Sequence, residues 1–270
     1  MPELPEVETT RSGIEPHVIG RKISGVVIRQ PQLRWPVPEQ ELRELEGLSI
    51  KKVVRRGKYI LLNTDLGSIL IHLGMSGSLR VISDERSALK HDHVDIQFSH
   101  GVLLRYTDPR RFGAILWQPK GQTHERIASL GPEPLSEQFD GCYLHQQCRG
   151  RSVTIKQFIM NSKVVVGVGN IYANEALFQA GIDPRKSAGR ISEKRLVLLA
   201  QRIKSVLSSA IQQGGTTLKD FVDSDGKPGY FQQSLNVYGR GGEPCLACGR
   251  ILSEVRLGQR STVFCNDCQR

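Results

Sequence analysis

The chain has 270 residues, enough for about two domains, and it combines 39% hydrophobic with 24% charged residues. These proportions are typical of a globular protein and argue against a fibrous or largely disordered chain. Lysine and arginine (37) exceed aspartate and glutamate (27), so the formal net charge is +10, which favours polyanionic partners and nucleic acid above all.

The sequence gives no sign of membrane insertion or export. No apolar run approaches the ~18 residues of a membrane span. The first eight residues, MPELPEVE, are acidic and broken by proline, whereas a signal peptide has a basic start and an apolar core. We therefore expect a cytoplasmic protein.

Residues 1–130 are predicted to form a strand-rich domain. A short helix opens it, with Pro5 in the first turn and its end near Gly13. Short runs rich in β-branched residues follow, most of them separated by glycine or polar turns, so we expect an antiparallel sandwich or barrel. The predicted strands are Lys22–Gln30, Ile50–Arg56, Tyr59–Asn63, Ile69–Leu73, Ser78–Ile82, His93–Ser99, Val102–Tyr106 and Ala114–Trp117.

The second half of the chain has a different pattern. Gly131-Pro132-Glu133-Pro134 opens a predicted linker over residues 131–150. Helical periodicity follows over Val153–Met160, Ile171–Ala180 and Ser192–Gln213, with Asn170 and Ser192 as N-cap candidates. Residues 151–240 are therefore predicted to be a helical domain. The segment SDGKPG at residues 224–229 indicates a loop of about 20 residues, a length that is usually functional or mobile.

Four of the six cysteines lie in the last 26 residues, in a C-x2-C, sixteen-residue, C-x2-C pattern formed by Cys245, Cys248, Cys265 and Cys268. Two such pairs supply the four thiolates of a tetrahedral zinc site. Two disulfides are the alternative, but a chain without an export signal stays in a reducing compartment. Because all four ligands are cysteine, we expect one structural Zn²⁺ in residues 241–270 with no catalytic role. Cys142 and Cys148 are not spaced like metal-binding cysteines and are expected to be ordinary free thiols.

Pro2 becomes a free secondary amine if Met1 is removed. An α-amino group has a reference pKa near ~8, so part of it is neutral at pH 7 and can attack an electrophilic sugar carbon. A proline followed by glutamate is also a common way to start a helix. On this signal alone, a purely structural role is favoured.

Four further segments have possible DNA-binding chemistry. His72–Gly77 and Thr107–Gly113 are glycine-flanked turns that could present an apolar wedge and an arginine to a base stack. From these residues alone, a buried Phe and Met with solvated arginines is slightly favoured. Gly167-Val168-Gly169 precedes a helix, where open amides bind phosphate. His91 and His93 share one face if they lie on a strand, with Asp92 on the other, so a hydrogen-bonding or phosphate-binding pair is favoured over a metal site.

These motifs together closely resemble bacterial formamidopyrimidine-DNA glycosylases over essentially the whole chain. The resemblance rests on PELPEVET at residues 2–9, His72–Gly77, Thr107–Gly113, Val165–Glu175, Gly214–Tyr230 and the four-cysteine module. It implies an α+β fold: an N-terminal β-sandwich with flanking helices, a helical domain with a helix-two-turn-helix, and a C-terminal zinc finger. It also implies duplex DNA in the cleft between the halves, with an oxidised purine flipped into a pocket.

The resemblance assigns roles to individual residues. Pro2 would attack C1′ and displace the base, Glu3 would assist opening of the sugar ring, Lys58 would serve β-elimination, and Arg260 would serve δ-elimination and phosphate binding. Met75, Arg110 and Phe112 would fill the space left by the flipped base, and Asn170, His91 and Arg151 would contact the DNA backbone. The segment Thr217–Tyr238 would close over the flipped base. The family's enzymes are expected to be monomers.

Two positions depart from the family pattern, and three alternatives remain. Asn161 stands where aspartate is more usual and Arg151 where lysine is frequent, which bears on the strength of DNA binding rather than on the reaction.

The closest alternative is an endonuclease VIII-like enzyme for oxidised pyrimidines, but that family usually begins Pro-Glu-Gly-Pro-Glu, whereas position 4 here is leucine. A non-catalytic zinc-dependent protein that binds damaged DNA would need neither a free Pro2 nor Lys58. An RNA-binding zinc ribbon is the third.

Overall fold

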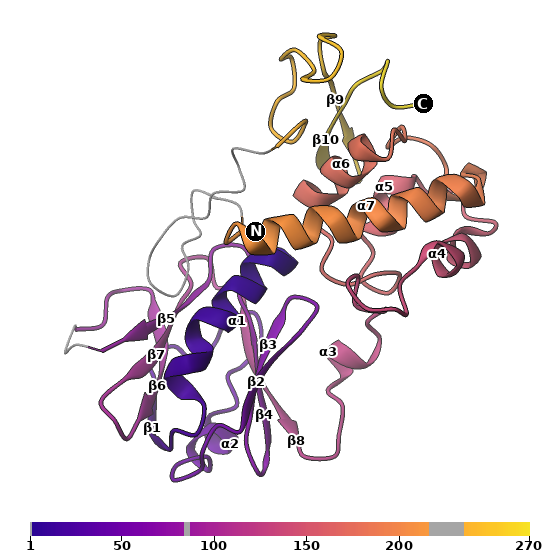
Figure 1. The fold of residues 1–270 in the computed structure, drawn as a ribbon. Helices are drawn as coiled ribbons and strands as arrows, with labels where there is room; N and C mark the ends of the chain where they lie inside the picture. The colour runs from indigo at the N-terminus through magenta and orange to yellow at the C-terminus, as the bar shows by residue number, and fades with distance from the viewer. Residues whose placement is uncertain (1, 84–86, 216–234) are drawn as a thin grey trace. The chain divides into compact units, whose positions relative to one another are not determined.

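The computed structural model describes residues 2–83, 87–215 and 235–270. By its internal contacts the chain divides into two compact units, Met1–Ala128 with Gln213–Tyr230, and Ser129–Gln212 with Phe231–Arg270. Figure 1 gives the order of the elements within each unit. None of the described helices combines the length and the apolar character needed to cross a bilayer.

The first unit contains two antiparallel four-stranded sheets. One has the order β1 (Ile23–Ile28), β6 (Asp92–Phe98), β7 (Leu103–Thr107), β5 (Ser78–Ile82). The other has the order β2 (Lys52–Arg56), β3 (Tyr59–Asn63), β4 (Gly67–His72), β8 (Ala114–Pro119). All eight predicted strands are present, with ends within two residues of the prediction, and they form a sandwich rather than a barrel.

One continuous core lies between these sheets, and helix α1 (Leu4–Val18) contributes to it. The helix contacts β2 and β3 of one sheet and β5 of the other, as Figure 1 shows. The prediction that it ends near Gly13 was wrong. The helix continues through Pro16 to Val18 because Ile14 and Val18 are fully buried in the core, and this burial outweighs the weak helix propensity of glycine and the backbone bond lost at Pro16.

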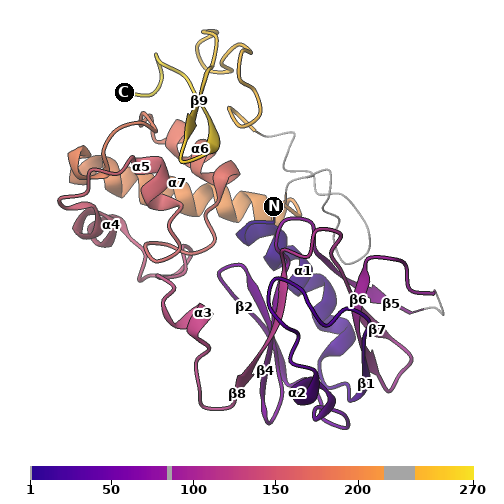
Figure 2. The same ribbon diagram turned by 180° about the vertical axis from the view of Figure 1, so that it is seen from behind.

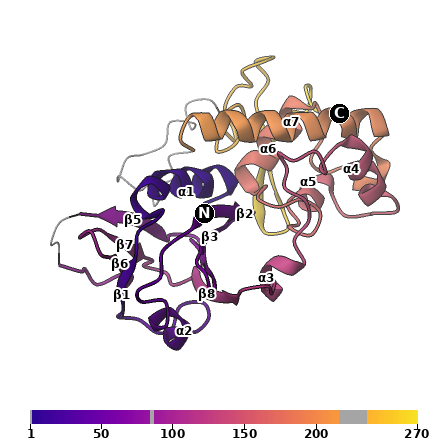
Figure 3. The same ribbon diagram turned by 60° about the horizontal axis from the view of Figure 1, so that its bottom comes forward.

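The second unit is mainly helical. Its elements are α4 (Gly141–Cys148), α5 (Ile155–Ile159), α6 (Asn170–Gln179), the 3₁₀ turn η1 (Ala188–Arg190), α7 (Glu193–Gln212) and the hairpin β9 (Ser253–Leu257) with β10 (Arg260–Phe264). Helix α7 buries an apolar face at helical spacing and packs against α4 and α6 (Figure 3). Helix α6 in turn lies against β10, and the β9–β10 hairpin, labelled at β9, is seen beside α6 in Figure 2.

Three of the described α-helices were not predicted. Helix α4 lies within residues 131–150, which were predicted to be a linker. Its N-cap is Asp140, whose carboxylate accepts a hydrogen bond from the amide of Tyr143 at 2.7 Å. The short helices α2 (Glu39–Arg43) and α3 (Glu125–Ala128) have only five and four residues. Such short segments carry too little periodicity to be recognised.

Candidate functional site

The start of helix α1 fixes Pro2 and Glu3 in place. Glu3 is the N-cap residue and is only 2% exposed. Its amide donates to Oε2 of Glu6 at 2.8 Å, a contact that satisfies one of the open amides at the helix start. Pro2 is buried beside it. The predicted nucleophile and its acidic neighbour are therefore part of an ordered helix terminus.

Lys58 lies in the tight turn of the β2–β3 hairpin. The last paired residues are Arg56 and Tyr59, so Gly57 and Lys58 form a two-residue turn. Gly57 has φ +56°, a left-handed conformation that favours glycine and sets the direction of Lys58. The lysine is half-buried.

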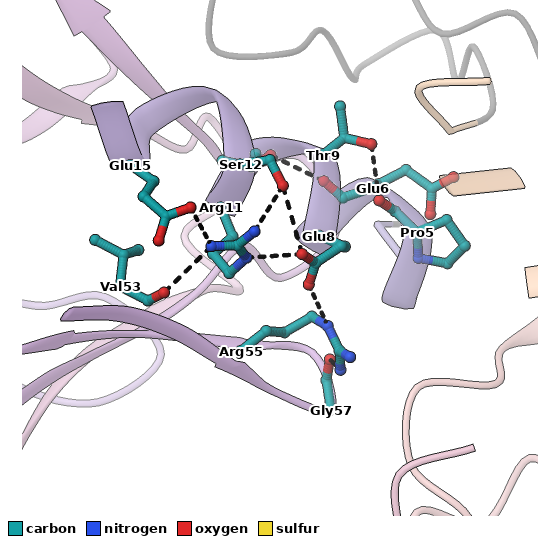
Figure 4. A network of polar contacts seen from close by, with 11 residues as sticks. Pro5, Glu6, Glu8, Thr9, Arg11, Ser12, Glu15, Val53, Arg55 and Gly57 are labelled. Atoms are coloured by element: carbon teal, nitrogen blue, oxygen red, sulfur yellow. Dashed lines mark hydrogen bonds and ion pairs between the residues drawn. The ribbon is translucent and has the colours of Figure 1, made fainter. Parts of the chain in front are cut away.

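A network of ion pairs connects helix α1 to this hairpin (Figure 4). Glu8 accepts from Nε of Arg55 at 2.8 Å and from Nε of Arg11 at 2.7 Å. Arg55 also donates to the carbonyl of Gly57 at 3.1 Å, and Arg11 donates to the carbonyl of Val53 at 3.3 Å. The helix that carries Pro2 and Glu3 is thereby tied to the turn that carries Lys58.

Replacing Arg55 with alanine is expected to loosen that connection. The half-buried Glu8–Arg55 pair and the Gly57 contact are charge-assisted, so we expect the free energy of unfolding to fall by about 1–3 kcal/mol. The Glu8→Gln/Arg55→Ala double-mutant cycle in urea measures the coupling. Arg43→Ala, which removes the exposed Arg43–Glu39 pair, is the matched control and should change stability by less than about 0.5 kcal/mol. Equal effects of the two arginine substitutions would contradict this assignment.

The turns His72–Gly77 and Thr107–Gly113 lie against each other. A Cβ on Gly74 would lie 2.4 Å from the nitrogen of Gly113, so this contact requires glycine. Met75, in the first turn, is half-buried. In the second turn Phe112 is 45% exposed, and the guanidinium of Arg110 lies 4.8 Å from its ring centroid. The structure thus presents an exposed aromatic ring and a cation on a rigid turn, the pair suited to entering a base stack.

The structure does not place His91 and His93 together on one face of a strand, as the sequence pattern predicts. Strand β6 begins at Asp92, and a register shift between Asp92 and Val94 removes the simple alternation. Nε2 of His93 bonds the carbonyl of Asp108 at 2.7 Å, which confirms the hydrogen-bonding interpretation for that residue. Asp92 instead accepts from the hydroxyl of Thr107 at 2.5 Å. In the described part of the chain, these residues do not form a cluster able to hold a metal.

The ring of His72 is held neutral at the end of β4. Its Nδ1 accepts from the amide of Gly74 at 3.0 Å. Burial, assisted by the positive charges of Lys58 and Arg34, lowers the pKa of His72 from 6.5 to about 4. A neutral imidazole with Nδ1 as acceptor has its proton on Nε2.

This lowered pKa predicts a pH-dependent stability. Between pH 6.5 and pH 4 the unfolded chain binds a proton at His72 that the folded chain does not, so stability falls as the pH falls. From pH 7 to pH 5 the loss is about 2 kcal/mol. Urea unfolding at the two pH values should show this difference reduced in His72→Gln relative to the unmodified chain. An unchanged difference would show that His72 is not the titrating group.

Asn170 lies at the start of α6, in the second unit. The N-cap is Gly169, so the prediction that Asn170 is the cap was wrong, and Asn170 is the first helical residue. Among the described residues its Oδ1 is the one buried side-chain polar atom without a hydrogen-bond partner. A flip of the amide would put the Nδ2 donor in that position, at the positive end of the helix dipole, where an anion would satisfy it.

Arg260 stands exposed at the turn of the β9–β10 hairpin. Gly258 and Gln259 make the turn with φ of +53° and +64°. Nζ of Lys156, fully buried, donates to the carbonyl of Ser261 and to the hydroxyl of Thr262, both at 2.7 Å. The hairpin is therefore fixed to α5 one residue from Arg260. Arg151 is exposed after α4.

The four terminal cysteines converge. The Sγ atoms of Cys245, Cys248, Cys265 and Cys268 all lie within 4.8 Å of one another, and no other such metal-binding group occurs among the described residues. A tetrahedral site with Zn–S distances of about 2.3 Å separates its sulfurs by about 3.8 Å, so the cluster fits one zinc ion. The prediction of a four-cysteine structural zinc site is confirmed. Cys142 is exposed, whereas Cys148 is buried, and burial raises the pKa of Cys148 to about 12.

One buried carboxylate in the second unit was missed by sequence reasoning. Glu175 accepts hydrogen bonds from the amides of Asn236, Val237 and Tyr238, each at 2.9 Å, and from the side chain of Asn236. It thereby holds the end of the segment Thr217–Tyr238, of which residues 217–234 lie outside the described residues. The sequence does not reveal this role of Glu175, because the residues that donate hydrogen bonds to it lie about sixty positions away.

Comparison with known proteins places all three regions in one family. The models of the formamidopyrimidine-DNA glycosylase N-terminal domain, the formamidopyrimidine-DNA glycosylase H2TH domain and the zinc finger found in FPG and IleRS match residues 1–115, 130–222 and 242–270. The chain belongs to the formamidopyrimidine-DNA glycosylase family. Proteins called formamidopyrimidine-DNA glycosylase from Stutzerimonas stutzeri and Pseudomonas entomophila are 58% and 59% identical to it over 270 residues, the full length of each.

Solved structures of this family have the same fold. The MutM (Fpg) protein of Thermus thermophilus matches with a TM-score of 0.89 at 37% identity, covering 99% of this chain and 98% of that one. Lactococcus lactis Fpg in complex with DNA containing an abasic site matches with a TM-score of 0.91 at 33% identity and 99% coverage of both chains. The predicted fold class, with its sandwich, helix-two-turn-helix and zinc finger, is confirmed.

Proposed function

We propose that this protein is a bifunctional DNA glycosylase and AP lyase that removes oxidised purines, 8-oxoguanine and formamidopyrimidines, from duplex DNA. The observation that carries the proposal is the ordered Pro2-Glu3 terminus of α1 in a chain that matches glycosylases of this name along its full length. Two of the similar structures are complexes with DNA that contains Fapy-dG or carbocyclic 8-oxo-G. The relatives' name favours oxidised purines over the pyrimidines of the endonuclease VIII alternative.

The chemistry begins at Pro2 once Met1 has been removed. The secondary amine attacks C1′ of the damaged nucleotide, the N–C1′ bond forms, and the glycosidic bond breaks as the base leaves with a proton. Glu3 protonates the sugar-ring oxygen, and ring opening yields an iminium on Pro2. The positive end of the α1 dipole lies beside this amine and favours its neutral, reactive form.

Two eliminations then cut the strand. Loss of a C2′ proton breaks the bond from C3′ to its phosphate oxygen, and we assign Lys58 to this β-elimination. Loss of the C4′ proton then breaks the bond from C5′ to its phosphate oxygen, and we assign Arg260 to this δ-elimination and to phosphate binding. Water hydrolyses the remaining iminium, which releases the unsaturated sugar aldehyde and restores the Pro2 amine. The product is a gap of one nucleoside with a phosphate at each side.

The remaining residues bind the DNA. Met75, Arg110 and Phe112 fill the space left by the flipped base, with Phe112 as the wedge and Arg110 facing the unpaired cytosine. His91, Arg151 and Asn170 contact the backbone, a role supported by the net charge of +10 and by the unsatisfied amide of Asn170. The zinc ion folds the finger that carries Arg260 and does not touch the reaction. We place the enzyme in the cytoplasm at the nucleoid, as a monomer.

Product analysis tests the proposal. The purified protein should convert a 5′-labelled duplex with 8-oxoguanine opposite cytosine into a fragment ending in a 3′-phosphate, at a single-turnover rate at least about tenfold above that for a duplex with an oxidised pyrimidine. Preference for the pyrimidine lesion would support the endonuclease VIII alternative. Binding of the lesion without cleavage would support the non-catalytic alternative.

A further inference from the structure

Asp108 is the centre of the two turns in the first unit. Its side chain is fully buried. Oδ1 accepts from the hydroxyl of Ser76 at 2.9 Å and from the amide of Arg110 at 3.3 Å. Oδ2 accepts from the amide of Gly113 at 2.8 Å and lies 3.4 Å from the hydroxyl of Tyr106. One carboxylate thus contacts both turns and both ends of the segment Arg110–Gly113.

The backbone of Asp108 adds three further contacts. Its amide donates to the carbonyl of His91 at 3.1 Å. Its carbonyl accepts from Nε2 of His93 at 2.7 Å and from the amide of Arg111 at 3.1 Å. Arg111 has φ +54°, a left-handed conformation that is rare for a residue with a Cβ, so this turn needs outside contacts to hold its shape.

The surroundings leave no room for an alternative arrangement. A Cβ on Gly113 would lie 1.8 Å from the Tyr106 hydroxyl, and one on Gly77 would lie 2.3 Å from the carbonyl of Leu73. The Tyr106 hydroxyl also bonds the carbonyl of His72 at 3.1 Å. Burial and the nearby Asp108 charge raise the pKa of Tyr106, so it stays a neutral donor. The two turns are therefore packed around the Asp108 carboxylate.

We infer that Asp108 is the positioning residue that pre-forms the Met75, Arg110 and Phe112 wedge. It acts through Ser76 in the first turn and through the Arg110 and Gly113 amides in the second, so that Phe112 is presented to the base stack before DNA arrives. This inference rests on the proposed function, because it assumes that these three side chains enter DNA.

Only a carboxylate satisfies this position. The Arg110 and Gly113 amides donate to different oxygens of Asp108. In Asp108→Asn one of the two would face an NH₂ group, and either orientation of the amide leaves a buried donor unpaired. Even this isosteric substitution is therefore expected to disturb the wedge.

Asp95→Asn is the matched control. Asp95 lies on β6 in the same unit, is 1% exposed and accepts from Arg29 and Arg105 at 2.7–2.9 Å. These two arginines lie outside both turns, so loss of the Asp95 charge should lower thermal stability without moving the wedge. The comparison separates a general effect of removing a buried carboxylate from the specific effect at Asp108.

The experiment places 2-aminopurine beside an 8-oxoguanine in a duplex and follows its fluorescence on mixing with each protein. The unmodified protein and Asp95→Asn should give the same rise as the stack is opened. Asp108→Asn should lose most of this rise, with single-turnover excision from the duplex lower by about tenfold to a hundredfold. Borohydride trapping on single-stranded abasic DNA, which has no stack to open, should stay within about twofold for all three proteins.

The outcomes distinguish the two proposals. If Asp108→Asn matches Asp95→Asn in both the fluorescence rise and the excision rate, the role of Asp108 is disproved while the proposed function stands. If the unmodified protein neither traps abasic DNA nor excises 8-oxoguanine, the proposed function itself fails. Where Asp108→Asn does not fold, Ser76→Ala removes one of the four contacts and should lower the fluorescence rise and the excision rate by about threefold. No change in Ser76→Ala would then overturn the inference.

Discussion

Replacing Pro2 with leucine should abolish covalent trapping on abasic DNA and lower single-turnover excision of 8-oxoguanine by at least about 10³-fold. A large second residue keeps Met1 on the chain, so the amine at this position becomes a peptide nitrogen without nucleophilic character. DNA binding should change by less than about fivefold, because the residues that we assign to the backbone are untouched.

Pro5→Ala is the matched control for this change. Pro5 is a proline in the first turn of the same helix, and it is buried, but its ring nitrogen lies within the chain and has no role in the chemistry. Excision by this variant should stay within about threefold of the unmodified protein. An active Pro2→Leu protein, or an equal loss in the two variants, would mean that Pro2 acts only as a helix starter.

Removing the zinc ion is expected to have the second large effect. Among the described residues, the hydrophobic cluster at the finger's core has five buried members, two of which are zinc ligands: Val237, Cys245, Leu252, Val263 and Cys265. So small a core cannot hold a fold alone, and the binding energy of structural zinc, about 10 kcal/mol or more, replaces it. In Cys248→Ser we expect less than one zinc per chain and at least about a hundredfold weaker cleavage of lesion DNA.

Cys142→Ser controls for the loss of a thiol, because Cys142 is exposed on α4 and is not a zinc ligand. It should retain one zinc per chain and full cleavage. Hydrogen exchange should show lost protection in β9 and β10 of Cys248→Ser while α7 stays protected. Full zinc content and cleavage in Cys248→Ser would contradict the structural role of the four-cysteine site.

The sequence predicted the parts of the fold that are encoded locally. The strands follow from β-branched runs between glycine turns, and α7 follows from a long apolar face, so these elements match closely. The end of α1 was misjudged because Ile14 and Val18 are held by the core, a tertiary effect that overrides Gly13 and Pro16. The missed helix α4 had a local signal, the Asp140 cap, within a segment that opens with Gly131, Pro132 and Pro134.

The residues of the candidate site likewise divide into those that the sequence predicted and those that it could not. The spacing of the four cysteines is enough to predict a zinc site. The role of Pro2 could be predicted only together with the other family motifs. The carboxylates that hold the site in place, half-buried Glu8 and buried Asp108 and Glu175, could not be predicted, because a carboxylate is common in any sequence. Their partners, Arg55, Ser76 and Val237, lie 47, 32 and 62 positions away. The roles assigned to individual site residues, and the domain boundaries at residues 130, 150 and 240, stay predictions.

The central claim is that the Pro2 amine forms the covalent bond to DNA, and one measurement tests it directly. The protein is incubated with a duplex carrying 8-oxoguanine opposite cytosine, borohydride is added, and the cross-linked peptide is identified by mass. We predict a reduced adduct on the nitrogen of an N-terminal Pro2, with Met1 absent. An adduct on Lys58 or another lysine, or cleavage without any adduct, would contradict the account.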